Sequence, residues 1–299
     1  MSIGPGGVRQ SALMVEFSAA REFIYANARV LEQRLFALVF DGGSPEKVVA
    51  ALGAYQNGDG GFGHGLEPDK RAPDSQPLDV EIAFEYLAAA QARGGLLASS
   101  ACDWLASIAE PSGAVPIVLP SISGYPRAAH WNALKYPPAV NPTAAIAAHA
   151  HRLGVSHAWL DRATEYCLAE LEAGRVRPEA HSLLAMTKLV EVVSDRPRAE
   201  AAAGCIAAAL PQAAYVKIDP ESSDYGVTPL DFSPTPETMA RAWFSDDLIE
   251  SHLTCLESAQ QADGGWPISW QPPSEASRWE WRGIRTLSAV RTLAAHHRL

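Results

Sequence analysis

The segment 63–69 reads GHGLEPD and gathers chemically reactive side chains in a stretch without a helical or strand pattern. It contains His64, Glu67 and Asp69, and Pro68 restricts the backbone between the two acids. Two carboxyl groups in different surroundings can serve as an acid and a base, because burial raises the pKa of one of them. We therefore take Glu67 and Asp69 as candidate catalytic acids. The structural alternative is that both cap helices.

Two further acids extend this set of candidates. Asp231 lies in the segment 224–234, DYGVTPLDFSP, which is rigid and aromatic, unlike a solvated linker. Asp246 follows Ser245 at an expected helix start, where a serine cap and acidic residues suit the positive end of a helix. Each therefore has a competing structural interpretation, a loop turn for Asp231 and a helix start for Asp246.

Aromatic residues and histidines accompany the acids in the same long loops. The faces of aromatic rings stabilise cations, and tryptophan rings also stack on sugars. For each ring the structural alternative is a place in the core or an anchor for a loop. The candidate substrate contacts are His64, His130, Trp131, Tyr225, Phe232, Trp270 and Trp281.

A ten-residue pattern occurs twice, near the two ends of the chain. Residues 54–63 read AYQNGDGGFG and residues 258–267 read SAQQADGGWP. The glycines allow backbone conformations that other residues avoid. Each copy follows one expected helix and precedes another, so the repeat predicts scaffolding rather than catalysis. The matching positions are Gln56, Asp59 and Phe62 in the first copy and Gln260, Asp263 and Trp266 in the last.

Helical patterns dominate the chain, and abundant alanine, the strongest helix former, supports them. The one short strand-like stretch is 115–119, so we expect an all-α protein. The connections 58–76, 111–140, 214–237 and 264–282 are long, which is typical of functional loops. The expected helices are 17–39, 44–55, 78–92, 99–109, 142–153, 158–172, 178–193, 198–209, 246–261 and 283–297.

Repeated helix pairs must stack on one another, because a single pair cannot bury its apolar face. A weaker copy of the unit is expected at 167–193, where Ala173-Gly174 replaces the two glycines. The clear copies lie at opposite ends of the chain, so we expect the array to close into a ring. With no flexible linker, residues 1–299 are expected to form one domain, with 1–15 as a flexible start.

The repeat resembles the Gln/Trp repeat of squalene-type cyclases, and the chain is similar to the α/α-toroid superfamily of terpenoid cyclases and protein prenyltransferases. This resemblance implies an (α/α)6-type toroid of helical hairpins with long rim loops. In that fold the Gln amide bonds to unpaired backbone groups at a neighbouring helix end. The residues that support it are Gln260, Asp263-Gly264-Gly265-Trp266, Thr286 and Leu293, with Gln56 and Asp59-Gly60-Gly61-Phe62.

The resemblance further implies acid-initiated cyclisation of an isoprenoid or prenylated small molecule in a central aromatic cavity, without a cofactor. The Asp-x-Asp-Asp acid motif, the zinc-binding set and the Asp-rich diphosphate motif of the superfamily are absent from this sequence. The proton donor would then be Glu67, Asp69, Asp231 or Asp246. One alternative is a toroid glycoside hydrolase or polysaccharide lyase with paired carboxylates. The other is a non-catalytic toroid that binds an apolar ligand or a partner.

The composition of the chain argues against several classes of binding partner. The net charge of −10 argues against nucleic acid, which requires a basic face, and against anionic membranes. The apolar stretches are too short to cross a bilayer. The first residues lack a secretory pattern and the four cysteines are far apart, so we expect a cytoplasmic protein with buried thiols and no metal site. The expected partner is a small apolar substrate, and the oligomeric state is left open.

Overall fold

The computed structural model describes residues 15–133 and 135–299. Within these ranges the protein is all-helical, and pairing between extended residues is limited to isolated bridges. The expected all-α class is therefore confirmed. Apart from Val15, the expected flexible start lies outside the described residues.

The helices alternate with connections of very unequal length. The anticipated long loop 111–140 contains short 3-10 turns at Pro120–Gly124 and Ala129–Asn132, and another 3-10 turn, Met239–Trp243, lies just beyond the anticipated loop 214–237. The α-helices are α1 (Phe17–Asn27), α2 (Val30–Phe40), α3 (Pro45–Gly53), α4 (Pro77–Ala89), α5 (Leu96–Ile108), α6 (Val140–Arg152), α7 (Ala158–Glu172), α8 (Ala180–Val190), α9 (Arg196–Ala209), α10 (Pro229–Phe232), α11 (Asp246–Ser258) and α12 (Glu275–Ala295).

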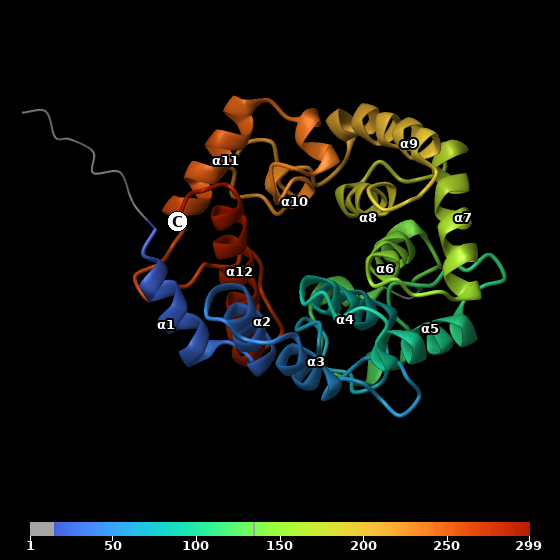
Figure 1. Ribbon diagram of the computed structural model, residues 1–299, viewed down its shortest axis with the longest axis horizontal. Helices are drawn as coiled ribbons and strands as arrows, with labels where there is room; N and C mark the ends of the chain where they lie inside the picture. The colour runs from blue at the N-terminus through green and yellow to red at the C-terminus, as the bar shows by residue number, and fades with distance from the viewer. Residues whose placement is uncertain (1–14, 134) are drawn as a thin grey trace, which may run out of the picture.

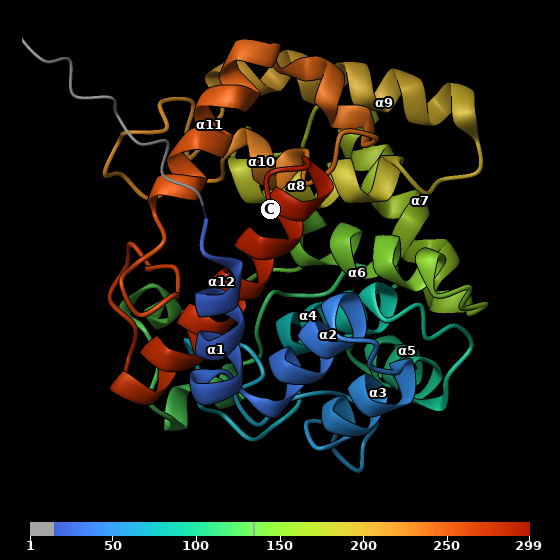
Figure 2. The same ribbon diagram turned by 60° about the vertical axis from the view of Figure 1, so that its left-hand side comes forward.

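The helices follow one another around a closed circuit, with the odd-numbered helices outside and the even-numbered helices inside (Figure 1). Helix contacts agree with this arrangement. On the inside, α4 packs against α6, α6 against α8, and α8 against α10. Helix α1 packs against α12, so the first and last helices lie side by side, as both Figure 1 and Figure 2 show.

Helix α6 shows why so much alanine is used. Every residue from 142 to 150 is buried, and most of them are alanine. Small side chains let α4, α7 and α8 approach this helix closely, and all three pack against it. One apolar core extends through the molecule, and its largest fully buried side chains include Trp159, Phe36 and Phe84.

Several sequence-based expectations are wrong in detail. The expected helix 17–39 is two helices, because the chain is extended at Ala28 and Arg29. Side-chain amides satisfy carbonyls at this break: Gln33 Nε2 donates to the Ala28 carbonyl at 2.9 Å. The four-residue helix α10 lies where a loop was expected. Two cysteines, Cys102 and Cys167, are buried as expected, whereas Cys205 is exposed and Cys255 is half-buried.

The two glycine-rich turns have the same hydrogen bonds. Asn57 N–H donates to the Gly61 carbonyl and Gln261 N–H to the Gly265 carbonyl, each at 2.9 Å. Gly61 N–H and Gly265 N–H donate to the carboxylates of Asp59 and Asp263, at 2.9 Å and 3.1 Å. Phe62 and Trp266 are both buried. The repeat in the sequence is therefore a repeat of backbone geometry.

Each turn attaches to the start of the next outer helix through its glutamine. Gln56 Nε2 donates to the Leu97 carbonyl of α5 at 3.0 Å. Gln260 donates to the Glu16 carbonyl at 3.0 Å and accepts from Glu16 N–H at 2.8 Å, just before α1. The glycines at 60 and 264 have φ of +92° and +87°, and a Cβ there would lie 2.5 Å and 2.2 Å from a carbonyl of that helix. Only glycine permits such close contact.

A third copy of this turn follows α5, at residues 110–115, where the sequence reads EPSGAV. Glu110 N–H donates to the Ala114 carbonyl at 3.0 Å, and Gly113 has a φ of +92°. Trp159 of α7 replaces the glutamine, since its indole N–H donates to the Gly113 carbonyl at 2.9 Å. The weaker copy expected at Ala173-Gly174 is wrong, because that segment is an ordinary helix end in which Arg175 N–H bonds back to the Glu170 carbonyl.

Candidate functional site

Asp69 is the centre of the best-defined group of candidate residues. Its carboxylate accepts one hydrogen bond from each of two indoles: Trp270 Nε1 donates to Oδ2 at 3.0 Å and Trp281 Nε1 to Oδ1 at 2.9 Å. The side chain is almost completely buried. His130 Nε2 lies 3.8 Å from Oδ2 and its side chain is 53% exposed. A buried acid thus lies between two indole donors and one solvent-accessible imidazole.

The two halves of this group come from opposite ends of the chain. Asp69 lies in the loop after the first glycine-rich turn, whereas Trp270 lies in the loop after the last one and Trp281 in α12. An ion pair between Arg71 and Glu280, with Nη2 and Oε1 3.2 Å apart, joins the same two regions. The site is therefore assembled by the contact between the first and last helical hairpins.

The aromatic group extends from these indoles. Trp270 and Trp281 pack edge to face with ring centres 5.1 Å apart, and Tyr225 packs edge to face on Trp270 at 6.2 Å. His181 stacks on Tyr225 at 5.8 Å. On the other side, Trp131 packs against His130 at 4.9 Å. Among the described residues, six of the sequence candidates thus form one neighbourhood: Asp69, His130, Trp131, Tyr225, Trp270 and Trp281.

Three buried ionisable residues, Glu67, Lys70 and Asp79, lie next to Asp69. Lys70 Nζ donates to Asp79 Oδ1 at 2.7 Å and lies 3.7 Å from Glu67 Oε2. All three side chains are buried, and Glu67 Oε2 and Asp79 Oδ2 have no hydrogen-bond partner. The pKa of Glu67 is raised to about 7, mainly by burial and also by the Asp69 and Asp79 charges, while Lys70 opposes this increase.

The pKa of Asp69 itself is also raised. The cause is burial, which the hydrogen bond from Trp281, the His130 charge and the hydrogen bond from Trp270 oppose. Burial lowers the pKa of His130 despite the nearby Asp69. A proton on Asp69 is therefore more stable than it would be in water, and His130 is mainly neutral near pH 7.

The remaining sequence candidates lie elsewhere. His64 is exposed and its Nε2 lies 2.8 Å from Asn57 Oδ1 within its own turn. Asp231 forms a capping box with Thr228 at the start of α10, as the structural interpretation anticipated. Asp246 is exposed and pairs with Arg241. Phe232 is buried and contributes to a separate pocket.

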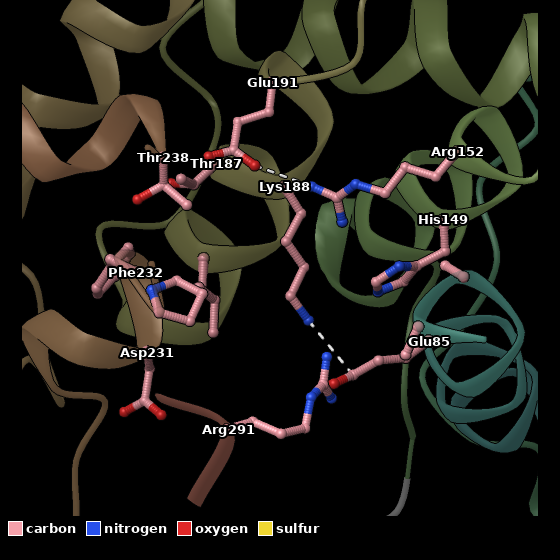
Figure 3. A pocket seen from close by; sticks show the side chains of 14 residues that line it. Glu85, His149, Arg152, Thr187, Lys188, Glu191, Asp231, Phe232, Thr238 and Arg291 are labelled. Carbon is pink, nitrogen blue, oxygen red and sulfur yellow. Dashed lines mark hydrogen bonds and ion pairs between the residues drawn. The ribbon is translucent and has the colours of Figure 1, made fainter. Parts of the chain in front are cut away.

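This pocket has a volume of about 310 Å³ and lies among the inner helices α4, α6, α8, α10 and α12 (Figure 3). The expectation of an aromatic lining is wrong for it, because Phe232 is its one aromatic ring among the described residues apart from the imidazole of His149. Lys188, Arg291 and Glu85 point toward one another within it. Its titratable side chains are Glu85, His149, Arg152, Lys188, Glu191, Asp231 and Arg291.

Sequence reasoning missed most of this pocket. Lys188 stands in the otherwise apolar run of α8, and His149 in the alanine-rich run of α6. A charged or polar residue inside an apolar helix was the available indication, because such side chains are rarely buried without a partner.

Among the described residues no cluster of His, Cys, Asp and Glu is arranged to hold a metal ion. Nor does any helix in the described ranges combine the length and apolar character needed to span a bilayer.

No protein-family model and no curated protein matches this chain.

Proposed function

We propose that this chain is an (α/α)6 toroid of the terpenoid cyclase and protein prenyltransferase type. Its support is the turn geometry: each of three turns attaches to the next outer helix, and the last one attaches to α1. The order of inner and outer helices in Figure 1 agrees with six hairpins that close on themselves. In this proposal the turns are scaffolding, and the long loops that follow them provide the chemistry.

The proposed activity is acid-initiated cyclisation of an isoprenoid or prenylated small molecule, with Asp69 as the proton donor. One observation supports this most strongly: Asp69 is buried and held by Trp270 and Trp281 within an aromatic group. Aromatic rings stabilise cations that form beside them. Hydrogen bonds from the two indoles fix the position of the acid and stabilise the carboxylate that remains after proton transfer.

The proposed reaction consumes no co-reactant. The Asp69 carboxyl group gives its proton to a carbon–carbon double bond, whose π electrons form the new C–H bond and leave a carbocation. Further double bonds of the same substrate close the ring, and the final cation gives a proton to solvent, which restores its neutrality. His130, exposed and 3.8 Å from Asp69, returns a proton from solvent to the acid.

Contacts around Glu67 disfavour the two alternative functions. A paired-carboxylate hydrolase needs two acids facing each other across a sugar-sized gap. Glu67 instead turns back to accept from Asp69 N–H at 3.2 Å and is buried beside Lys70. A non-catalytic binding protein would have its acids fully hydrogen-bonded, whereas one oxygen of Glu67 and one of Asp79 have no hydrogen-bond partner, although Lys70 pairs with both acids.

The test is incubation with prenyl diphosphates and prenylated aromatic compounds, with products scored for new rings. We expect D69N to form cyclised product at least about 100-fold more slowly than wild type, which is the contribution of a general acid. D246N is the matched control, because Asp246 is exposed and distant in role, and it should keep the wild-type rate. Unchanged turnover in D69N, or no cyclised product from any of these substrates, would refute the proposal.

A further inference from the structure

The polar pocket among the inner helices contains groups whose hydrogen bonds the protein leaves unmade. His149 is 4% exposed, and neither ring nitrogen has a partner. Burial lowers its pKa well below the usual range, helped by Lys188 and Arg152, so the ring is neutral and offers one donor and one acceptor. Glu191 Oε1 is also buried without a partner. A buried polar group without a partner is costly, so a bound molecule that both donates and accepts hydrogen bonds would be stabilised here.

Cations and carboxylates alternate within this pocket. Arg152 donates to Glu191 at 2.9 Å, while Lys188 Nζ lies 3.9 Å from Glu85 Oε2 and 3.7 Å from Oε1 of Glu81 outside the lining, both too far for a good hydrogen bond. Arg291 makes no hydrogen bond or ion pair with the part of the chain that the structure describes. Three cations face three carboxylates when Asp231 is included, so the lining has no net charge.

The equal numbers of cations and carboxylates in the lining argue against a ligand with a net charge. The lining residues lie toward the carboxyl ends of α4, α6, α8 and α12, where the helix dipoles are negative and disfavour an anion. A zwitterion would need a positive pole and a separate negative pole. Lys188, Arg291 and Glu85 instead meet at one place (Figure 3). Hydroxyl groups both donate and accept, so adjacent hydroxyls match adjacent cations and carboxylates.

We infer that this pocket is a binding site for a small neutral polyhydroxylated molecule of monosaccharide size. The volume of about 310 Å³ is at the lower end for small-molecule sites. Phe232 contributes to the apolar part of the lining, and His149 bonds to a hydroxyl of the ligand. The inference goes beyond the proposed cyclase activity, because it uses none of the residues around Asp69.

The test is isothermal titration calorimetry of the full chain with glucose, galactose, mannose, ribose, myo-inositol and glycerol. Glycine and inorganic phosphate serve as zwitterionic and anionic contrasts. We expect at least one polyol to bind with a Kd of about 1 mM or lower, and tighter than glycine or phosphate. Saturation by phosphate or glycine but by no polyol, or no heat from any polyol, would overturn the inference.

Variants locate the binding. H149L should weaken polyol binding at least about tenfold. His151 lies on the same helix but bonds to Thr164 of α7, so H151L is the matched control and should bind as wild type does. R291Q removes a side chain without described partners, so it tests the site even where H149L fails to fold, and it too should bind at least about tenfold more weakly. Wild-type affinity in R291Q would contradict the inference. Asp69 does not line this pocket, so D69N should bind polyols as wild type does. Polyol binding by D69N therefore tests the pocket independently of the proposed cyclisation.

Discussion

The first and last glycine-rich turns share one backbone geometry but attach to very different partners. The first turn, through Gln56, attaches to α5, the next outer helix along the chain. The last turn, through Gln260, attaches to Glu16, 244 residues earlier. One hydrogen-bond pattern therefore extends the row of helices in one place and closes it in the other.

The two turns also differ in how their aspartates are held. Asp59 accepts from the Ser75 hydroxyl at 2.7 Å. Asp263 instead forms two hydrogen bonds with Arg282, each of 2.7 Å, and this guanidinium also lies over the ring of Phe23 in α1, 4.6 Å from its centre. The closing turn thus has a charged, multivalent anchor where the internal turn has a hydroxyl. We infer that closure requires the stronger attachment, because no chain connection holds α1 beside α12.

We expect the largest effect on stability when the aromatic residue of either turn is removed. Phe62 is fully buried, and Trp266 is 2% exposed and donates from Nε1 to the Leu256 carbonyl at 2.7 Å. F62A and W266A should each lower the free energy of unfolding by about 3–5 kcal/mol, because each leaves a large cavity. Urea denaturation followed by circular dichroism measures this. L96A, at an 86% exposed position, is the control and should change stability by less than about 0.5 kcal/mol.

The second prediction concerns Glu67, which lies eleven residues after Gln56 of the first turn. The residue eleven positions after Gln260 of the last turn is Gln271, which has no acid. The folded protein raises the pKa of Glu67 from 4.5 to about 7. Its folded-state proton therefore stabilises the protein fully below pH 4.5, and this contribution is lost as pH rises to 7. We expect wild type to lose about 3 kcal/mol of stability across that window relative to E67Q.

Denaturation of both proteins at a series of pH values measures this difference. Parallel stability curves for wild type and E67Q from pH 4 to pH 8 would show that Glu67 keeps an ordinary pKa, contrary to this account.

A smaller difference should separate the two aspartates. D263A leaves the mainly buried Arg282 without its carboxylate and should cost about 2 kcal/mol, whereas D59A should cost about 1 kcal/mol. Arg282 lowers the pKa of Asp263 below 3.8, so its contribution is present above that pH and is lost as pH falls through the lowered value. Equal losses in the two variants at pH 7 would show that the closing turn is no better anchored than the internal one.

The smallest expected effect comes from the glutamines, at about 1 kcal/mol each for Q56A and Q260A. Their local consequences should differ. Hydrogen exchange should become about fivefold faster at the start of α5 in Q56A and at the start of α1 in Q260A. Mass spectrometry of peptides from 15–27 and 95–108 resolves the two cases. Faster exchange at the same helix in both variants would contradict the pairing of each turn with its own outer helix.

The sequence predicted the scaffold better than the site. Two copies of the turn were visible because both keep Gln, Asp, Gly-Gly and an aromatic residue. The copy at 110–115 was not, since it keeps the backbone geometry and one glycine while a distant residue, Trp159, makes the connecting bond. Backbone geometry tolerates many side chains, so sequence comparison finds only the copies that also keep their side chains.

Site residues were predicted singly rather than as partners. Asp69, Trp270 and Trp281 were each candidates, but their hydrogen bonds join residues more than 200 positions apart and depend on closure. Asp231 and Asp246 were candidates from their local sequence alone, and the structure agrees with their structural interpretations, a capping box for Asp231 and a helix start for Asp246. The pocket around His149 was missed because it requires five helices to converge.

The most direct test of the central claim, that closure brings Asp69 to the indoles of the last hairpin, is nuclear magnetic resonance of protein labelled with ¹⁵N at tryptophan. Trp270 and Trp281 are two of eight tryptophans, and W270F and W281F assign their indole N–H signals. We expect these two signals to shift together in D69N, while the signals of the indoles that donate to backbone carbonyls, Trp159 and Trp266, stay in place. If D69N leaves both indole signals unchanged, the Asp69 carboxylate does not bind the two indoles and does not hold the two ends of the chain together.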